Sequence, residues 1–182
     1  MKAGRGSGPG PRPTSRTIVS CTPAGSTPTA GTCTASSFAA AAGPVLLQGE
    51  YTATSVNQFE GLPKANFSGY YAFASWMITG EKRPYSVEEG EPAGYIYPKN
   101  RSLGAFELAV RISNLSLNDM AADVMGGEGN NVTLALNWRP YSNLRFMVNY
   151  IFVNHDEWAT GHGDYAGNDD YRILQTGFYF SF

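Results

Sequence analysis

The residues with the most obvious potential for chemistry form an acidic, histidine-containing segment near the C-terminus. It holds both histidines of the chain in the order His155, Asp156, Glu157, His162, Asp164, Asp169 and Asp170. Imidazole and carboxylate ligands together can hold a divalent cation. No helical spacing fixes their geometry, so an exposed acidic loop is the stronger interpretation, and we predict no metal or other cofactor. A histidine-dependent hydrolase would need these same histidines, and no serine lies in a G-x-S-x-G turn. We therefore predict that the chain is not an enzyme.

A second chemical feature is an arginine that shares a strand face with an acid. In 103–115, Arg111 follows Ala109 and Glu107 at every second position, while the intervening positions are large and apolar. Side chains of an extended strand alternate between two faces, so Arg111 and Glu107 lie on the same face. An ion pair between Arg111 and Glu107, or a carboxylate of a neighbouring strand, is one interpretation of this arrangement.

The same alternation recurs along the chain and defines the elements that would carry these residues. Segments of about ten residues with period-two hydrophobicity are typical of transmembrane β-strands. The sequence predicts six strands and a remnant at 38–42, the strands being 45–56, 66–79, 103–115, 131–139, 144–154 and 171–182. We therefore predict an all-β, antiparallel transmembrane β-barrel.

The last predicted strand has the clearest pattern. Thr176, Phe178, Phe180 and Phe182 fall on one face, and smaller or polar residues fall on the other. A soluble protein rarely ends on such an aromatic face because chain termini fray into water. A strand whose apolar face contacts lipid has no such difficulty.

The connections between the predicted strands alternate in length. Turns at 43–44 and 139–143 are short, whereas 57–65, 116–129 and 155–170 are longer and polar. Outer-membrane barrels have short periplasmic turns and long external loops. If Phe182 lies at the periplasmic rim, the long connection 80–102 is also periplasmic, where length is unusual. We predict that it folds into the lumen and narrows it.

Composition supports a membrane-exposed β protein with one barrel domain over 38–182. Charged residues make up only 15% of the chain, and no apolar run is long enough for a transmembrane helix. The net charge of −2 excludes a basic nucleic-acid surface. Residues 1–37 are rich in Gly, Pro, Ser, Thr and Ala, so we predict a disordered or non-native leader.

Several motifs, in order and spacing, resemble the phosphate-selective porin O and P family of Gram-negative outer membranes. They include Gly43-Pro44, Gln48-Gly49-Glu50-Tyr51, Gly69-Tyr70-Tyr71, Trp76-Met77-Ile78-Thr79-Gly80-Glu81, Gly104 to Arg111, Leu117-Asn118-Asp119, Asn130 to Leu134, and Arg145 to Tyr150. The resemblance implies the C-terminal six or seven strands of a barrel of about sixteen. We accordingly expect a truncated chain, and a homotrimer when the protein is full length.

The resemblance also implies partners and site residues. Gln175, Gly177, Phe178, Phe180 and Phe182 match the signal that the barrel-assembly machinery of outer membranes recognises. The family's function implies passive diffusion of inorganic anions such as phosphate or polyphosphate through a basic-lined lumen, with membrane lipid around it. Arginine suits this role because it binds phosphate oxygens in a bidentate manner. The implied anion path consists of Arg111 in mid-strand, Arg139 and Arg145 near the periplasmic rim, and Lys82 and Arg83 on the long connection.

Two other function classes stay open. A soluble antiparallel β-sandwich that binds a ligand would also alternate apolar and polar residues, but its apolar faces would have to meet in a core. A membrane-embedded hydrolase is disfavoured because the nucleophile motif is missing.

Overall fold

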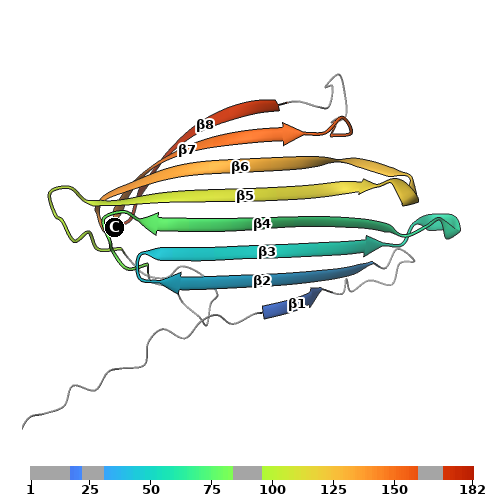
Figure 1. Cartoon of the computed structure of the whole chain (residues 1–182), viewed down its shortest axis with the longest axis horizontal. Helices are drawn as coiled ribbons and strands as arrows, with labels where there is room; N and C mark the ends of the chain where they lie inside the picture. The colour runs from blue at the N-terminus through green and yellow to red at the C-terminus, as the bar shows by residue number, and fades with distance from the viewer. Residues whose placement is uncertain (1–16, 22–30, 84–95, 160–169) are drawn as a thin grey trace, which may run out of the picture.

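The computed structural model describes residues 17–21, 31–83, 96–159 and 170–182. In these ranges the chain forms a single eight-stranded antiparallel sheet in which each strand pairs with its neighbours in sequence (Figure 1). The strands are β1 (Thr17–Cys21), β2 (Thr32–Ala42), β3 (Val45–Val56), β4 (Ala65–Met77), β5 (Ala105–Asp119), β6 (Val124–Tyr141), β7 (Leu144–His155) and β8 (Asp170–Phe180). Short 3₁₀ turns, η1 (Phe59–Gly61) and η2 (Met120–Ala122), follow β3 and β5.

The sheet has two chemically distinct faces. Cross-strand partners lie on the same face, and the register places Leu108 opposite Leu136, which lies opposite Val148. We call this side the apolar face. The other side, the polar face, carries Gln48, Glu107, Arg111, Asn137 and Arg145 at the alternate positions of their strands. In the described residues no second sheet covers the apolar face. This arrangement is expected of barrel strands and not of a two-sheet sandwich.

Aromatic rings form a belt across the apolar face near one end of the strands. Phe106 packs against Trp138 at 6.1 Å between ring centroids, Trp138 against Phe146 at 5.4 Å, and Phe146 against Phe178 at 5.4 Å. Such belts mark the level of a membrane–water interface in outer-membrane barrels. The belt thus indicates where these strands would cross one membrane–water interface.

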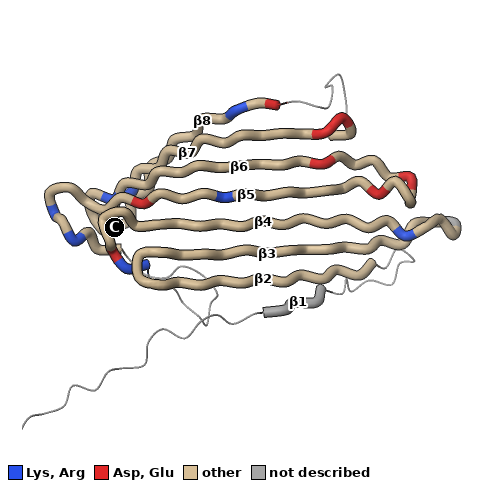
Figure 2. Tube along the Cα trace, viewed as in Figure 1, with Lys and Arg blue, Asp and Glu red and all other residues tan. Residues whose placement is uncertain are grey.

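Charged residues gather at the two ends of the strands. Figure 2 shows few charges in the middle of the sheet, where β5 carries Arg111 and β3 carries Glu50 about halfway along their lengths. We call the end with the turns 43–44 and 142–143 and the C-terminus the C-terminal rim. The end with η1, η2 and residues 156–159 is the loop rim. Both of these mid-sheet charges lie on the polar face, so the apolar face is uncharged at mid-sheet, as contact with a hydrocarbon layer requires.

The structure corrects the predicted start of the strands at residue 38. The remnant at 38–42 is the end of β2, which begins at Thr32 and pairs with β3 along its whole length, and β1 lies upstream of it. Sequence pattern missed these strands because β2 is built mainly from Ala, Ser and Thr, which carry little hydrophobic alternation. Backbone pairing with β3 holds β2 in an extended conformation instead. Residues 1–16 and 22–30 lie outside the described residues.

The predicted long loop 116–129 is also wrong. β5 and β6 continue pairing as far as Asp119 and Val124, with a bulge between Ser116 and Asn118, so the turn itself is short. Polar side chains hold this extension together: Gly127 N donates to Asn118 Oδ1 at 2.7 Å. Backbone pairing therefore continues where hydrophobic alternation has stopped. Within the described ranges, no helix has the length and apolar character needed to cross a bilayer.

Candidate functional site

The polar face carries an ionic cluster at the C-terminal rim, centred on Glu107. This carboxylate is 2% exposed and bonds to both Arg83 and Arg139, the latter at 2.8 Å. Asn137 Nδ2 also donates to Glu107 at 3.3 Å. Burial of a carboxylate is costly unless it is paired and hydrogen-bonded. Two arginines on one acid meet that requirement and leave the group with net positive charge.

Arg139 reaches Glu107 across the β5–β6 ladder, which is in regular register at this point. The β6–β7 pairing shifts between Trp138 and Tyr141, so Arg139 and Pro140 form a bulge. Arg139 pairs with Ala105 on β5, two positions from Glu107 on the same face. The bulge is on the side of β7, so the diagonal position of Arg139 relative to Glu107 in the β5–β6 ladder is what brings the two side chains together.

The described ends of the connection 80–102 are held against the same rim. Arg83 N donates to Gly43 O at 3.0 Å while the Arg83 side chain bonds to Glu107. Lys99 N donates to Glu81 Oε1 at 3.0 Å, and Ile96 packs with Met77 and Ala105 in a small buried cluster. Both described ends of the connection, near Arg83 and near Ile96, therefore lie against the polar face at the C-terminal rim. Residues 84–95, including the acidic run at 88–91, lie outside the described residues.

Glu81 secures the start of this connection. Burial by itself would raise the pKa of Glu81, but hydrogen bonds from Thr79 Oγ1 and Lys99 N, together with the Lys99 charge, outweigh it and hold the pKa below its usual value. Thr79 in turn accepts a hydrogen bond from Phe106 N at 3.1 Å. Glu81 thereby links the connection to the first residues of β5.

Arg145 adds another cation beside the Glu107 cluster. It lies on the polar face of β7, within electrostatic range of Arg139, Arg83 and Glu107. Its guanidinium carbon lies 5.6 Å from the centre of the Tyr179 ring. The buried Nε atoms of Arg145 and Arg83 have no hydrogen-bond partner within the described part of the chain.

Arg111 has a different environment. It is exposed on the polar face midway along β5, and its guanidinium carbon lies 4.8 Å from the centre of the Tyr71 ring. Gln48 Nε2 donates to the Tyr71 hydroxyl at 3.1 Å, which ties the ring to β3. The described ion pairs are those of Arg83 and Arg139 with Glu107, so no described carboxylate pairs with Arg111.

The structure thus sorts the predicted cations into two groups. Arg83, Arg139 and Arg145 gather at the C-terminal rim, Lys82 is exposed beside them, and Arg111 stands apart. The predicted Arg111–Glu107 pair is wrong, because Glu107 is taken by the other two arginines. Sequence reasoning also missed Tyr71 as the neighbour of Arg111. The two side chains are neighbours because Tyr71 pairs with Ser113, two positions from Arg111, and the sequence alone does not give this pairing.

The acidic, histidine-containing segment contributes structural contacts in its described part. The His155 ring lies 5.7 Å from Tyr171, and Asp156 accepts from Asn118 Nδ2 at 2.6 Å. Burial alone would raise the pKa of Asp156, but bonds from Asn118 and nearby backbone N–H groups hold it below its usual value. No trio of metal-ligating side chains occurs among the described residues. His162, Asp164 and Asp169 lie outside them.

The predicted assembly-signal residues occupy β8 and the end of the chain. Phe178 and Phe180 lie on the apolar face opposite Phe146 and Leu144. Gln175 Oε1 accepts from Asn149 Nδ2 at 3.4 Å on the polar face. A Cβ at Gly177 would come within 2.8 Å of the Met147 side chain, so glycine fits closely there. Phe182 is fully exposed beyond the strand.

Comparison with known proteins provides a family. The model of the family described as "Phosphate-selective porin O and P" matches residues 17–182. Porin O of Pseudomonas aeruginosa is 29% identical over 143 residues, covering 74% of this chain and 32% of that protein. An uncharacterized protein of Caulobacter vibrioides is 32% identical over 120 residues, covering 63% of this chain and 22% of its own length. The chain therefore spans about a third or less of these relatives.

Proposed function

Because the chain belongs to the phosphate-selective porin O and P family, whose members are outer-membrane proteins of Gram-negative bacteria, we propose that it forms part of an anion-diffusion pore. In this proposal the apolar face contacts lipid and the polar face lines the lumen. The anions are inorganic, such as phosphate or polyphosphate. The C-terminal rim lies at the periplasm and the loop rim outside.

The observation that carries the proposal is Arg111. A full positive charge in the middle of a span with few charges, Glu50 being the acid at this level of the same face, is costly unless that face is wet. Tyr71 fixes the guanidinium without neutralising it, so its N–H donors stay available to a passing anion. A fixed cation in a narrow pore lowers the free energy of an entering anion.

The C-terminal rim supplies a second cationic level along this path. Arg83 and Arg139 are partly neutralised by Glu107, but the group with Arg145 keeps a net positive charge. Lys82 is exposed beside it. The docked ends of 80–102 support our prediction that this connection narrows the lumen at the periplasmic side.

The remaining parts of the proposal follow from the family. We propose about sixteen strands in the complete barrel, assembly through the C-terminal signal Gln175, Gly177, Phe178, Phe180 and Phe182, and a homotrimer. The edges of the described sheet support further pairing, since β1 pairs with β2 and β8 with β7 alone.

The experiment is selectivity measurement on the chain extracted from outer membranes and placed in planar bilayers. We expect a reversal potential that favours anions under a potassium chloride gradient, and a fall of about five-fold or more in anion preference for Arg111→Gln. Arg172→Gln is the matched control, because it removes the same charge from the apolar face of β8. Cation preference in the wild type, or equal effects of the two variants, would contradict the proposal.

A further inference from the structure

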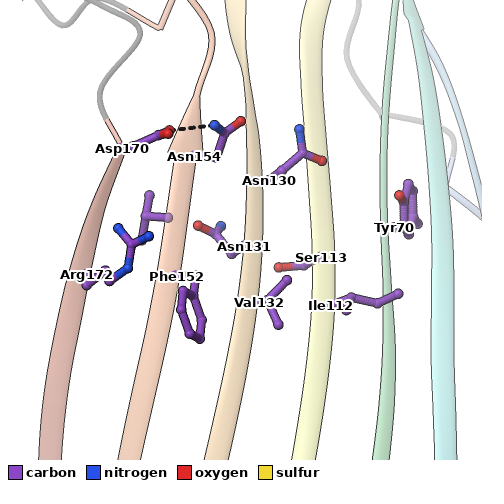
Figure 3. A pocket seen from close by; sticks show the side chains of 11 residues that line it. Tyr70, Ile112, Ser113, Asn130, Asn131, Val132, Phe152, Asn154, Asp170 and Arg172 are labelled. Carbon is purple, nitrogen blue, oxygen red and sulfur yellow. Dashed lines mark hydrogen bonds between the residues drawn. The ribbon is translucent and has the colours of Figure 1, made fainter.

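The apolar face contains a depression near the loop rim that the pore does not use. Its volume is about 430 Å³, and it extends from Tyr70 on β4 to Arg172 on β8 (Figure 3). Ile112, Val132 and Phe152 form its apolar part, and Asn130, Asn154 and Asp170 lie toward the rim. The depression is therefore apolar on one side and polar on the other, as a lipid molecule is.

Arg172 is the unusual residue of this depression. The register places it opposite Phe152 on the apolar face, and its guanidinium carbon lies 5.4 Å from the centre of that ring. It is exposed and forms no ion pair with a described carboxylate. A cation on the lipid side of a barrel is costly at mid-membrane and tolerated near the interface. Arg172 thus marks a level where anionic headgroups lie.

The acids nearby are already engaged by asparagine side chains. Asp170 accepts from Asn154 Nδ2, and Glu128 accepts from Asn114 Nδ2 at 2.7 Å. Asp170 lies two residues closer to the rim than Arg172, a rise of about 7 Å along the strand. The charges are therefore ordered by depth, with the acids nearest water and the arginine next to the apolar surface.

The surface below the depression fits acyl chains. A second, predominantly apolar hollow of about 610 Å³ lies on the same face between Val45 and Tyr150, lined by Trp76, Leu108, Leu134 and Val148 among others. A guanidinium held by an aromatic ring above such a surface matches a phosphate headgroup above hydrocarbon chains in both charge and polarity. The width from β4 to β8, about 19 Å at the spacing of neighbouring strands, suits a lipid with several chains.

We propose that this depression binds a phosphate-bearing lipid of the outer leaflet, with Arg172 holding the phosphate and the chains lying on the apolar face. The inference rests on the membrane orientation in the proposed function, but not on anion transport. Lipid retention is measured without any conductance, so failure of one proposal leaves the other intact.

The test is native mass spectrometry of the chain in detergent micelles containing diphosphoryl lipid A, with its monophosphoryl form and phosphatidylcholine as comparison lipids. We expect retention to follow phosphate content and to fall about five- to ten-fold in Arg172→Gln. Arg111→Gln, with the same charge change on the polar face, is expected to retain lipid as the wild type does. Millimolar inorganic phosphate is expected to compete weakly, because it lacks the chains.

Several outcomes would overturn the proposal. Unchanged retention in Arg172→Gln would remove the residue from the site. Equal losses in Arg172→Gln and Arg111→Gln would indicate general charge attraction. Loss on chelation or in Asp170→Asn, with Arg172→Gln unaffected, would indicate a metal-bridged headgroup. Oligomers that dissociate in Arg172→Gln without any change in lipid retention would make the occupant a second copy of the chain.

Discussion

Arginines occur on the polar face in two settings, and the difference between them separates structure from transport. At the C-terminal rim, Arg83 and Arg139 are bound to a buried carboxylate. In mid-sheet, Arg111 rests on the Tyr71 ring and is exposed. A carboxylate neutralises a guanidinium, whereas an aromatic ring positions it and leaves its charge and most donors available. The same residue type therefore holds the connection in one place and, in the pore that we propose, faces a permeating ion in the other.

Substitutions in the two settings are also expected to affect different properties of the protein. Glu107 joins β5, β6 and the connection at one point, so its removal affects several elements. Arg111, by contrast, rests on the ring of Tyr71 from one neighbouring strand, β4. Substitution at the rim should thus be seen in stability, and substitution in mid-sheet in selectivity.

The largest expected effect is that of Glu107→Gln on stability. Loss of the carboxylate charge leaves Arg83 and Arg139 without a counter-ion in a buried site, and we expect about 3 kcal/mol of destabilisation. Urea titration of the folded chain in detergent, followed by the gel-mobility difference between folded and unfolded forms, measures this. Glu50→Gln, on the same face at mid-sheet, is the control and should change stability by about 0.5 kcal/mol or less. Similar values for both variants would remove the distinction between the two settings.

A smaller effect is expected when the Tyr71 ring is removed. Tyr71→Leu eliminates the surface on which the Arg111 guanidinium lies, and a contact of this kind contributes about 0.5–1 kcal/mol. We expect anion preference in planar bilayers to fall about two- to five-fold, with stability nearly unchanged. Tyr71→Phe keeps the ring and loses only the bond from Gln48, so it should retain most of the preference. A loss in Tyr71→Phe as large as in Tyr71→Leu would show that the hydroxyl, not the ring, matters.

Much of the sheet could be predicted from sequence, and the reasons are physical. The predicted strand 45–56 coincides with β3, and those at 144–154 and 171–182 match β7 and β8 to within two residues. One face of each strand is apolar along its length, so the pattern is strong there. It fails in β2, whose Ala, Ser and Thr side chains are ordered by pairing. It also fails where β5 and β6 continue toward the loop rim, because their residues there no longer alternate between apolar and polar.

The candidate site was predicted less completely than the sheet. Alternation assigned Glu107, Arg111 and Arg145 to one face, as the register confirms. Which arginine meets Glu107 depends on the β5–β6 register at Arg139 and on the position of Arg83 in the connection. Both are set by backbone geometry between strands. Single-strand periodicity contains no such information, so it favoured the wrong pair.

The smallest expected effect concerns acid and tests how the connection is fastened. The pKa of Glu81 in the folded chain lies below its usual value of 4.5, so ionised Glu81 contributes stability above that value. This contribution, about 0.5 kcal/mol by the strength of one hydrogen bond, should be lost as the pH falls from 4.5 through the folded pKa. Urea titrations at pH 7 and pH 3.5 should therefore show Glu81→Gln less stable than the wild type at pH 7, with a smaller difference at pH 3.5. Glu157→Gln, at an exposed position of the loop rim, should show no such convergence. If the difference in free energy of unfolding between Glu81→Gln and the wild type were as large at pH 3.5 as at pH 7, the charge of Glu81 would not be what holds the connection. The connection would then be held by uncharged contacts, and the contrast between the ionic C-terminal rim and the Arg111–Tyr71 contact would be weaker.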